Sequence, residues 1–390
     1  MHAFGLNAAQ IDGAGAHWTV REVLQQPQVW AAIETLIAGE AARLHGFLEP
    51  LLQLPDIRLV LTGAGTSAHI GECLAPAFAR TLNRRVEAIP TTDLVASPRS
   101  YLSADIPTLL VSFGRSGNSP ESVAAIEVAD TSVRHCFHLI FTCDAGGALY
   151  RRANTTANTH VILLPEDSND RGFAMTSSFT GMLLAAALAL RVVPTGSART
   201  SALAHFAGQI LPDAMPVLQS LVSQDFTRMV YLGGKEFQGL AREAALKMLE
   251  LTDGQVVAIA DSPLGFRHGP KTILNRDTLV VVFVGNDDYT RQYDLDLIGE
   301  LRRDAVAGRV VALCARPDVA QHPDDLLLGT ARDSTGLCDL ELCLPYAMFA
   351  QSLALLRSLS LGVRPDTPNA AGTVSRVVKG VTIHPYRDGA

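Results

Sequence analysis

Short apolar runs alternate with longer stretches of helical period along most of the chain. Eight of these runs are long enough for a buried strand, at 58–61, 109–113, 139–142, 161–164, 228–232, 279–283, 310–313 and 340–344. Apolar strands that alternate with helices indicate parallel sheets joined by right-handed crossovers. We therefore expect an α/β fold built from doubly wound parallel sheets.

The spacing of these runs indicates an internal repeat. Three pairs of matching residues are each 170 positions apart: Gly63 and Gly233, Leu109 and Leu279, and Ile140 and Val310. The last run of each half ends before Pro165 and Pro345, which are 180 apart. We predict two tandem domains, at 51–200 and 201–364, that pack as a pseudo-dimer. One large α/β domain with accidental spacing is the alternative.

The two ends of the chain depart from this pattern. Residues 1–50 are predicted to form an N-terminal helical segment, in which Thr19 is an N-cap and Glu22 completes a capping box. Residues 365–390 form a Pro-rich C-terminal tail, and positions 377–383 alternate as in an edge strand or a tail.

Composition narrows the class of protein. The 390 residues are 48% hydrophobic and 18% charged, which suits large folded cores and argues against disorder. A formal charge of −7 argues against a nucleic-acid partner. The most apolar run, 181–190, is well short of the ~20 residues of a membrane span, and the start lacks a signal-peptide pattern. We expect a soluble cytoplasmic protein with no membrane partner.

The six cysteines form no CxxC pair and no regular framework: Cys73, Cys136, Cys143, Cys314, Cys338 and Cys343. Most adjoin apolar runs, so we expect reduced core thiols. His135, Cys136 and His138 resemble half of a zinc site, but the second ligand pair is missing. We interpret them as structural and predict no metal site.

The stretch 109–122, LLVSFGRSGNSPES, carries the clearest candidate chemistry. A strand breaks at Gly114, and Pro120 suits the first turn of a helix. Backbone amides, hydroxyls and the Arg115 guanidinium lie between them, and such groups at a helix N-terminus favour a dianion. The loop has neither a P-loop lysine nor G-x-G-x-x-G, which favours a phosphate monoester over a nucleotide. An ordinary strand–turn–helix is the alternative.

Ligands of doubly wound sheets bind at the carboxyl ends of the strands. Two more first-half loops qualify, TGAGTSA at 62–68 and the long segment 166–180. The second-half counterparts of the short loops, GGKEFQG and VGNDDY, are acidic or bulky. We therefore expect the first half to hold the phosphate and the second half to contribute other groups.

A charged stripe on the predicted helix 233–251 is the candidate contribution of the second half. At about 100° per residue, Glu243, Lys247 and Glu250 fall near 0°, 40° and 340° on an otherwise mostly apolar helix. A helix this apolar is mostly buried, so the stripe faces a solvent slot or a polar cavity. A solvated ion pair is the alternative.

His268 follows in a Gly/Pro-bounded loop, where it is either a proton carrier or a surface histidine.

Six motifs together resemble the sugar isomerase (SIS) domain superfamily and, within it, the AgaS family: TGAGTS, SFGRSGNSPES, AMTSSFT, EAALKMLELTDG, FRHGP and RVVKGVTIHPY. The resemblance covers the chain from about residue 19 onward. That family, formerly labelled tagatose-6-phosphate ketose/aldose isomerase, is now regarded as a galactosamine-6-phosphate deaminase/isomerase. The resemblance implies two SIS domains, no cofactor, and a homodimer or larger assembly with shared active sites.

The resemblance also implies the roles of nine residues. The substrate phosphate is expected at Thr66, Ser67, Arg115, Ser116 and Ser119. Glu250 matches the glutamate that moves a proton between C2 and C1, and Lys247 matches a lysine near the C1 and C2 oxygens. His268 matches the ring-opening histidine, supplied by the neighbouring subunit in the related synthase, and Lys379 matches a C-terminal active-site lysine.

This chemistry needs a proton carrier for ring opening and one carboxylate for the proton transfer, followed by hydrolysis of an imine with loss of ammonia. The phosphate is a handle that orients the sugar. Three alternatives remain: a ketose/aldose isomerase without deamination, the same reaction on glucosamine 6-phosphate, and a non-catalytic sugar-phosphate sensor. A sensor would carry a helix-turn-helix module, which residues 1–50 do not resemble.

Overall fold

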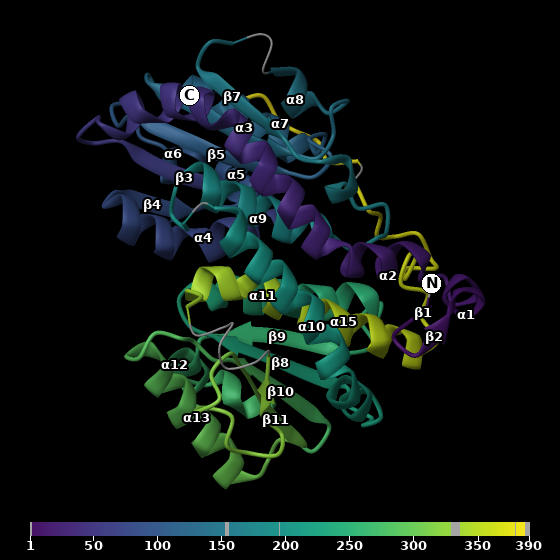
Figure 1. The fold of residues 1–390 in the computed structure, drawn as a ribbon. Coiled ribbons are helices and arrows are strands. Elements are labelled where there is room, and N and C mark those ends of the chain that lie inside the picture. The colour runs from purple at the N-terminus through teal and green to yellow at the C-terminus, as the bar shows by residue number, and fades with distance from the viewer. Residues whose placement is uncertain (1, 153–155, 195, 329–335, 379, 387–390) are drawn as a thin grey trace. The chain divides into compact units, whose positions relative to one another are not determined.

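The computed structural model describes residues 2–152, 156–194, 196–328, 336–378 and 380–386 (Figure 1). The chain divides into two compact units that are not continuous in sequence. We call one the β3–β7 unit, made of residues 29–170, 177–197 and 373–390. The other is the β8–β12 unit, made of residues 1–28, 171–176 and 198–372. Each contains a five-stranded parallel sheet.

The sheet of the β3–β7 unit has the strand order β4-β3-β5-β6-β7. Its strands are β3 Arg58–Thr62, β4 Arg85–Ala88, β5 Thr108–Gly114, β6 Cys136–Thr142 and β7 Thr159–Leu163. Its helices are α3 Gln26–Leu52, α4 Thr66–Leu82, α5 Thr91–Ala96, α6 Pro98–Tyr101, α7 Pro120–Ser132, α8 Ala148–Arg151, η2 Glu166–Ser168 and α9 Ser177–Ala189. Alternate strand residues such as Val60, Leu110 and Ile140 pack against α5 and α7 on one face.

The sheet of the β8–β12 unit has the order β12-β11-β10-β8-β9. Its strands are β8 Arg228–Gly233, β9 Val257–Asp261, β10 Thr278–Phe283, β11 Arg309–Cys314 and β12 Leu326–Leu327, and β1 His2–Ala3 pairs separately with β2 Leu6–Asn7. Its helices are α1 Ala8–Gly13, α2 His17–Leu24, α10 Ser197–Val222, α11 Glu236–Leu251, α12 Pro263–Phe266, η3 Pro270–Ile273, α13 Thr290–Asp304 and α15 Asp339–Ser360. Figure 1 shows α10, α11 and α15 on one side of this sheet and α12 and α13 on the other.

The two sheets have the same topology, which places a crevice at the same point in each. The first strand of each five-stranded sheet, β3 or β8, lies between the second and the third, so the strand order reverses between β3 and β5 and between β8 and β10. Ligands bind outside the carboxyl ends of the strands at such a switch point. The loops after β3 and β5 and those after β8 and β10 are therefore the two candidate sites that the fold creates.

The predicted fold class is confirmed, but one predicted strand is wrong. The apolar run 340–344 lies inside α15, and Pro345 also lies within that helix. A short apolar run has no period that separates a buried strand from a buried helix, and α15 is buried along nearly its whole length. The fifth strand of this sheet is the two-residue β12 instead. The edge strands β4 and β9 were missed because RVEA and VAIAD are short and partly polar.

The predicted capping box near the N-terminus is also wrong. Helix α2 begins at His17, so Thr19 lies inside its first turn. The carboxylate of Asp366 accepts hydrogen bonds from the amides of Trp18 and Thr19, at 3.0 and 2.8 Å, and from the Thr19 hydroxyl. Glu22 instead accepts a hydrogen bond from the amide of Gly172, at 3.1 Å. A distant carboxylate thus caps this helix, which no local pattern can reveal. At the other end, the described residues of 377–383 form no strand, which leaves the interpretation as a tail.

Two features bear on the environment of the chain. All six cysteines are free, and burial raises the pKa of the Cys136, Cys143 and Cys314 thiols to about 12.

Among the described residues one helix, α15, is long and apolar enough to cross a membrane, but 94% of its most apolar stretch is buried inside the protein. Such burial is typical of the core helix of a folded domain.

Candidate active site

The loop after β3 places two of the predicted phosphate ligands at the start of α4. Gly63 is required for close packing, because a Cβ there would lie 2.5 Å from the backbone carbon of Ser67. Gly65, the N-cap, has φ +55°, a conformation that favours glycine. Thr66 and Ser67 follow in the first helical turn, and both are buried. Both residues thus lie at the N-terminus of a helix that follows a strand end, where an anion is favoured.

The loop after β5 places the other three predicted ligands at the start of α7. Arg115 is buried, whereas Ser116 and Ser119 are half-buried. Gly117 has φ +60°, and a Cβ there would lie 3.1 Å from the Thr142 hydroxyl oxygen. Three hydrogen bonds hold the loop to the segment after β6: Cys143 N to Arg115 O at 3.0 Å, Ala148 N to Asn118 Oδ1 at 2.9 Å, and Leu149 N to Gly117 O at 3.1 Å.

These two loops share one edge of one sheet. Thr62 and Ser112, near the ends of β3 and β5, are register partners on neighbouring strands. The five predicted phosphate residues therefore follow adjacent strand ends at the switch point, and none of them is acidic. Amides, hydroxyls and one guanidinium in this arrangement suit a phosphate monoester. Whether they bind one stays a prediction.

The charged stripe on α11 forms a buried ion triad. Lys247 and Glu243 are each 1% exposed, and Lys247 Nζ lies 3.5 Å from Glu243 Oε1. Lys247 also pairs with Glu250, whose side chain is 26% exposed. Burial opposes the charge on Lys247, but the two carboxylates outweigh that effect, and the pKa of Lys247 is raised. Burial rules out the solvated stripe, and Glu250 is the member of the triad that reaches solvent.

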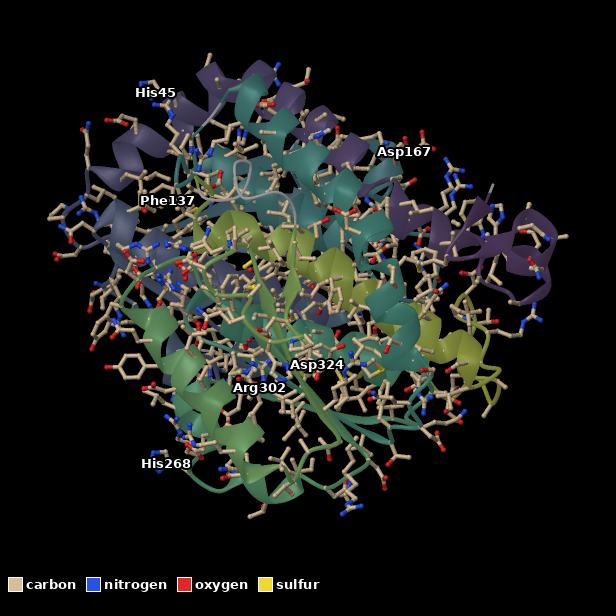
Figure 2. All side chains as sticks on the ribbon, turned by 60° about the horizontal axis from the view of Figure 1, so that its bottom comes forward. His45, Phe137, Asp167, His268, Arg302 and Asp324 are labelled. Carbon is tan, nitrogen blue, oxygen red and sulfur yellow. The ribbon has the colours of Figure 1, made fainter. Side chains whose placement is uncertain are left out.

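His268 lies in the same unit but on the opposite face of the sheet. Its loop follows α12, whose Phe266 packs with Val230 and Val282 on the face that α13 covers. Helix α11 covers the other face, where its Phe237 contacts Phe283. The His268 side chain is exposed and points away from the ribbon at the margin of Figure 2. The structure therefore does not bring His268 to the Lys247–Glu250 pair within one unit.

The remaining predicted residue, Lys379, lies outside the described residues.

Two residues that the sequence reasoning missed contact the predicted phosphate loop or its neighbours. Arg376 accepts a hydrogen bond from Arg115 through its carbonyl, at 3.1 Å, and Asp170 caps the start of α9. Asp170 stands seven and eight residues before its partners, Ser177 and Ser178, and Arg376 is 261 positions from Arg115. No local pattern joins such distant partners.

The equivalent crevice of the β8–β12 unit is filled by charged side chains of the same chain. Lys235, at the start of α11, lies 3.0 Å from Asp339, 3.8 Å from Asp287 and 3.9 Å from Glu236. The amide of Asn286, in the loop after β10, donates to Asp339 at 2.6 Å, and the amide of Gly285 donates to Asp294 at 3.1 Å. Carboxylates of α13 and α15 thus accept from amides of this strand-end loop. That the first half holds the phosphate and the second half contributes other groups stays a prediction.

Asp130, Cys136 and His138 gather at the amino end of β6, away from the strand-end loops. Their potential metal-ligating atoms lie within 4.8 Å of one another. Asp130 Oδ1 is hydrogen-bonded to His138 Nε2 at 2.7 Å, and Asp130 also pairs with Arg152. Because burial raises the Cys136 pKa, its thiol stays protonated at neutral pH. The cluster shares Cys136 and His138 with the set that the sequence singled out, but Asp130 stands in place of His135.

Comparisons with known proteins assign the chain to a family. A sequence model of the SIS domain matches residues 54–191. An Escherichia coli protein named D-galactosamine-6-phosphate deaminase AgaS is 47% identical over 373 residues, covering 95% of this chain and 96% of that one. A Shewanella sp. protein of the same name is 42% identical over 384 residues, covering 98% and 95%.

Solved structures agree with this assignment. The crystal structure of tagatose-6-phosphate ketose/aldose isomerase from Escherichia coli has a TM-score of 0.88 and 44% identity, and the match covers 95% of this chain and 97% of that one. The fold and the strand-end loops define a protein of the SIS domain class. Within that class, the chain belongs to the AgaS family.

Proposed function

We propose that this protein is a cytoplasmic deaminating isomerase of an amino sugar phosphate. It converts D-galactosamine 6-phosphate and water into tagatose 6-phosphate and ammonia. The observation that carries the proposal is the buried Lys247 ammonium held between two carboxylates, of which Glu250 reaches solvent. The names of relatives that match nearly the whole chain support the same substrate class.

The phosphate is the handle of the substrate. It binds Thr66, Ser67, Arg115, Ser116 and Ser119, which lie in the loops and first helical turns that follow β3 and β5 at the switch point. Charge-assisted hydrogen bonds to a dianion contribute roughly 1.5–3 kcal/mol each. Since the phosphate is remote from the reacting carbons, this binding energy orients the sugar for reaction.

The proton transfer uses the triad on α11. After ring opening, Glu250 takes the C2 proton and returns it to C1, while one proton passes from the amino group to the C1 oxygen, so that the 2-amino aldehyde becomes a 1-hydroxy-2-imine. Water adds to the imine carbon and ammonia leaves, so the reaction consumes one water for each ammonia released. Lys247, whose pKa is raised, remains an ammonium and stabilises the negative charge that develops on the C1 oxygen. Lys379 belongs to the same site by the family resemblance.

His268 opens the sugar ring, and it acts in the site of a neighbouring subunit. Its exposure and its place on the sheet face opposite α11 support this arrangement. The protein is then a homodimer or a larger assembly with shared sites. Mixing inactive Glu250→Gln and His268→Asn proteins tests this, because a mixed dimer with shared sites has one intact site and regains part of the activity. Mass spectrometry must first show that subunits exchanged. Inactive mixed dimers would contradict shared sites.

The activity itself is tested by measuring ammonia release from galactosamine 6-phosphate, glucosamine 6-phosphate and unphosphorylated galactosamine. We expect turnover of galactosamine 6-phosphate and negligible turnover of the unphosphorylated sugar. A protein that interconverts aldose and ketose 6-phosphates but releases no ammonia would instead be a ketose/aldose isomerase, the activity for which the similar Escherichia coli protein of known structure is named. Preference for glucosamine 6-phosphate would change the substrate and keep the reaction.

A further inference from the structure

The C-terminal tail contacts the phosphate loop inside the β3–β7 unit. The Arg115 side chain donates from Nη2 to the backbone carbonyl of Arg376, at 3.1 Å. The Arg376 guanidinium points back to the body of the unit and donates to the carbonyl of Asp170. One tail residue is therefore bound at both its carbonyl and its side chain. Its carbonyl contacts the buried guanidinium of the predicted phosphate loop.

Asp170, whose carbonyl accepts from Arg376, makes further hydrogen bonds through its side chain. It is fully buried, and its carboxylate accepts from the amides of Ser177 and Ser178, at 3.0 and 2.9 Å. These are the first residues of α9, so the carboxylate caps that helix while the carbonyl of the same residue binds Arg376. The tail is thus attached to a loop residue whose own side chain is hydrogen-bonded to the start of α9.

We propose that Arg376 is a positioning residue for the phosphate loop. Its side chain holds the tail against Asp170, and its carbonyl then fixes the orientation of the Arg115 guanidinium. This inference rests on the proposed function, in which Arg115 binds the substrate phosphate. A guanidinium is a planar fork of donors whose value for an oxyanion depends on its orientation. A guanidinium that is held in place before the phosphate arrives loses less conformational freedom on binding.

The geometry separates this role from direct binding of the phosphate by Arg376. The Arg376 guanidinium is bound to a backbone carbonyl, a contact that needs a donor and no net charge. Glutamine retains a donor and removes the charge, so Arg376→Gln should keep part of the positioning effect and abolish any direct charge contact. Exposed Val378, in the same tail segment, offers a matched control.

The experiment measures the dissociation constant of inorganic phosphate for the full-length protein by calorimetry, for wild type and for Arg115→Ala, Arg376→Ala, Arg376→Gln and Val378→Ala. We expect Arg376→Ala to weaken phosphate binding about 3–10-fold, the effect of releasing one long side chain. Arg376→Gln should recover at least half of that loss on a logarithmic scale, and Val378→Ala should match wild type. KM should follow the dissociation constant, and unchanged melting temperatures should show that the variants fold.

The results of this experiment distinguish a failure of the positioning role of Arg376 from a failure of the proposed phosphate site. If Arg115→Ala weakens phosphate binding and Arg376→Ala does not, the positioning role is wrong and the phosphate loop stands. If Arg376→Gln binds phosphate as weakly as Arg376→Ala, Arg376 is a direct ligand and the positioning role is again wrong. If neither alanine variant changes binding, the phosphate site of the proposed function is itself misplaced.

Discussion

The loops at the two switch points follow nearly the same backbone path but carry different charges. Gly65 has φ +55° and ψ −127°, and Lys235, 170 positions later, has φ +50° and ψ −121°. The first conformation suits glycine, whereas the second is disfavoured for a residue with a Cβ. The Lys235 side chain pairs there with Asp339. Such an outlier persists only where its surroundings hold it in place.

The two strand-end loops differ in which groups of the same chain contact them. At the β10 loop, the carboxylates of Asp339 and Asp294 accept amide hydrogen bonds of the kind that an external anion would take. At the β5 loop, the predicted ligands include no carboxylate. The β8–β12 unit instead supplies the buried triad on α11. We therefore assign substrate binding to one half and proton transfer to the other, as proposed above.

The largest expected effect is on the catalytic half. Glu250→Gln keeps the shape of the side chain and removes the base, so kcat should fall by roughly 10²–10⁴ with little change in folding. Exchange of the C2 hydrogen with solvent should stop together with ammonia release. Exchange that persists in the variant would move the base to another group, of which buried Glu243 is the nearest candidate.

The next effect separates the two crevices directly. Arg115→Ala should raise KM by about 10–150-fold, because one charge-assisted bond to the phosphate is lost. Lys235→Ala, the matched cation of the other crevice, should change KM less than about twofold, because that crevice holds no substrate phosphate. Steady-state kinetics of both variants test this. A large rise in KM for Lys235→Ala would indicate that the substrate phosphate binds in the β8–β12 unit, which would contradict this prediction.

A smaller effect concerns the stability of the filled crevice. Burial raises the pKa of Asp294 to about 7, against 3.8 for an ordinary aspartate. Between about pH 4 and 7 the native carboxyl keeps a proton that the unfolded one has lost, so this group lowers stability as the pH rises and adds no further change above 7. The shift sets an upper bound of about 4 kcal/mol, and we expect about 1 kcal/mol after relaxation.

The variant Asp294→Asn cannot ionise and should therefore flatten this pH dependence. Melting temperatures at pH 5 and pH 8 should differ less for the variant than for wild type, and the variant should be the more stable of the two at pH 8. A wild-type protein that gains stability between pH 5 and 8 and an unchanged slope in the variant would contradict the assignment.

The features that could be predicted from the sequence are those that a pattern of neighbouring residues determines. The 109–113 strand and the helix at Pro120 follow from an apolar run and a proline, and the structure confirms both, although the strand ends at Gly114 instead of breaking before it. The burial of Glu243 and Lys247 followed from the apolar composition of the rest of α11. The prediction of a strand at 340–344 is wrong because a short apolar run fits a buried helix as well as a buried strand.

Contacts between distant segments could not be predicted in the same way. Asp366 at α2, Asp339 at the β10 loop and Arg376 at Arg115 are each paired with residues more than fifty positions away. Nothing in the neighbouring sequence marks these partners, because the fold alone brings them together. The roles of the phosphate residues came from family resemblance, and the residue types alone left an ordinary turn as an equal alternative.

The number of phosphate sites in each chain tests the central claim most directly. Calorimetric titration of the full-length protein with inorganic phosphate should give one site per chain, because carboxylates of the same chain already accept the amides of the β10 loop. That site should weaken strongly in Arg115→Ala and persist in Lys235→Ala. Two sites per chain, or a single site that disappears in Lys235→Ala and survives in Arg115→Ala, would contradict the division of binding and chemistry between the two units.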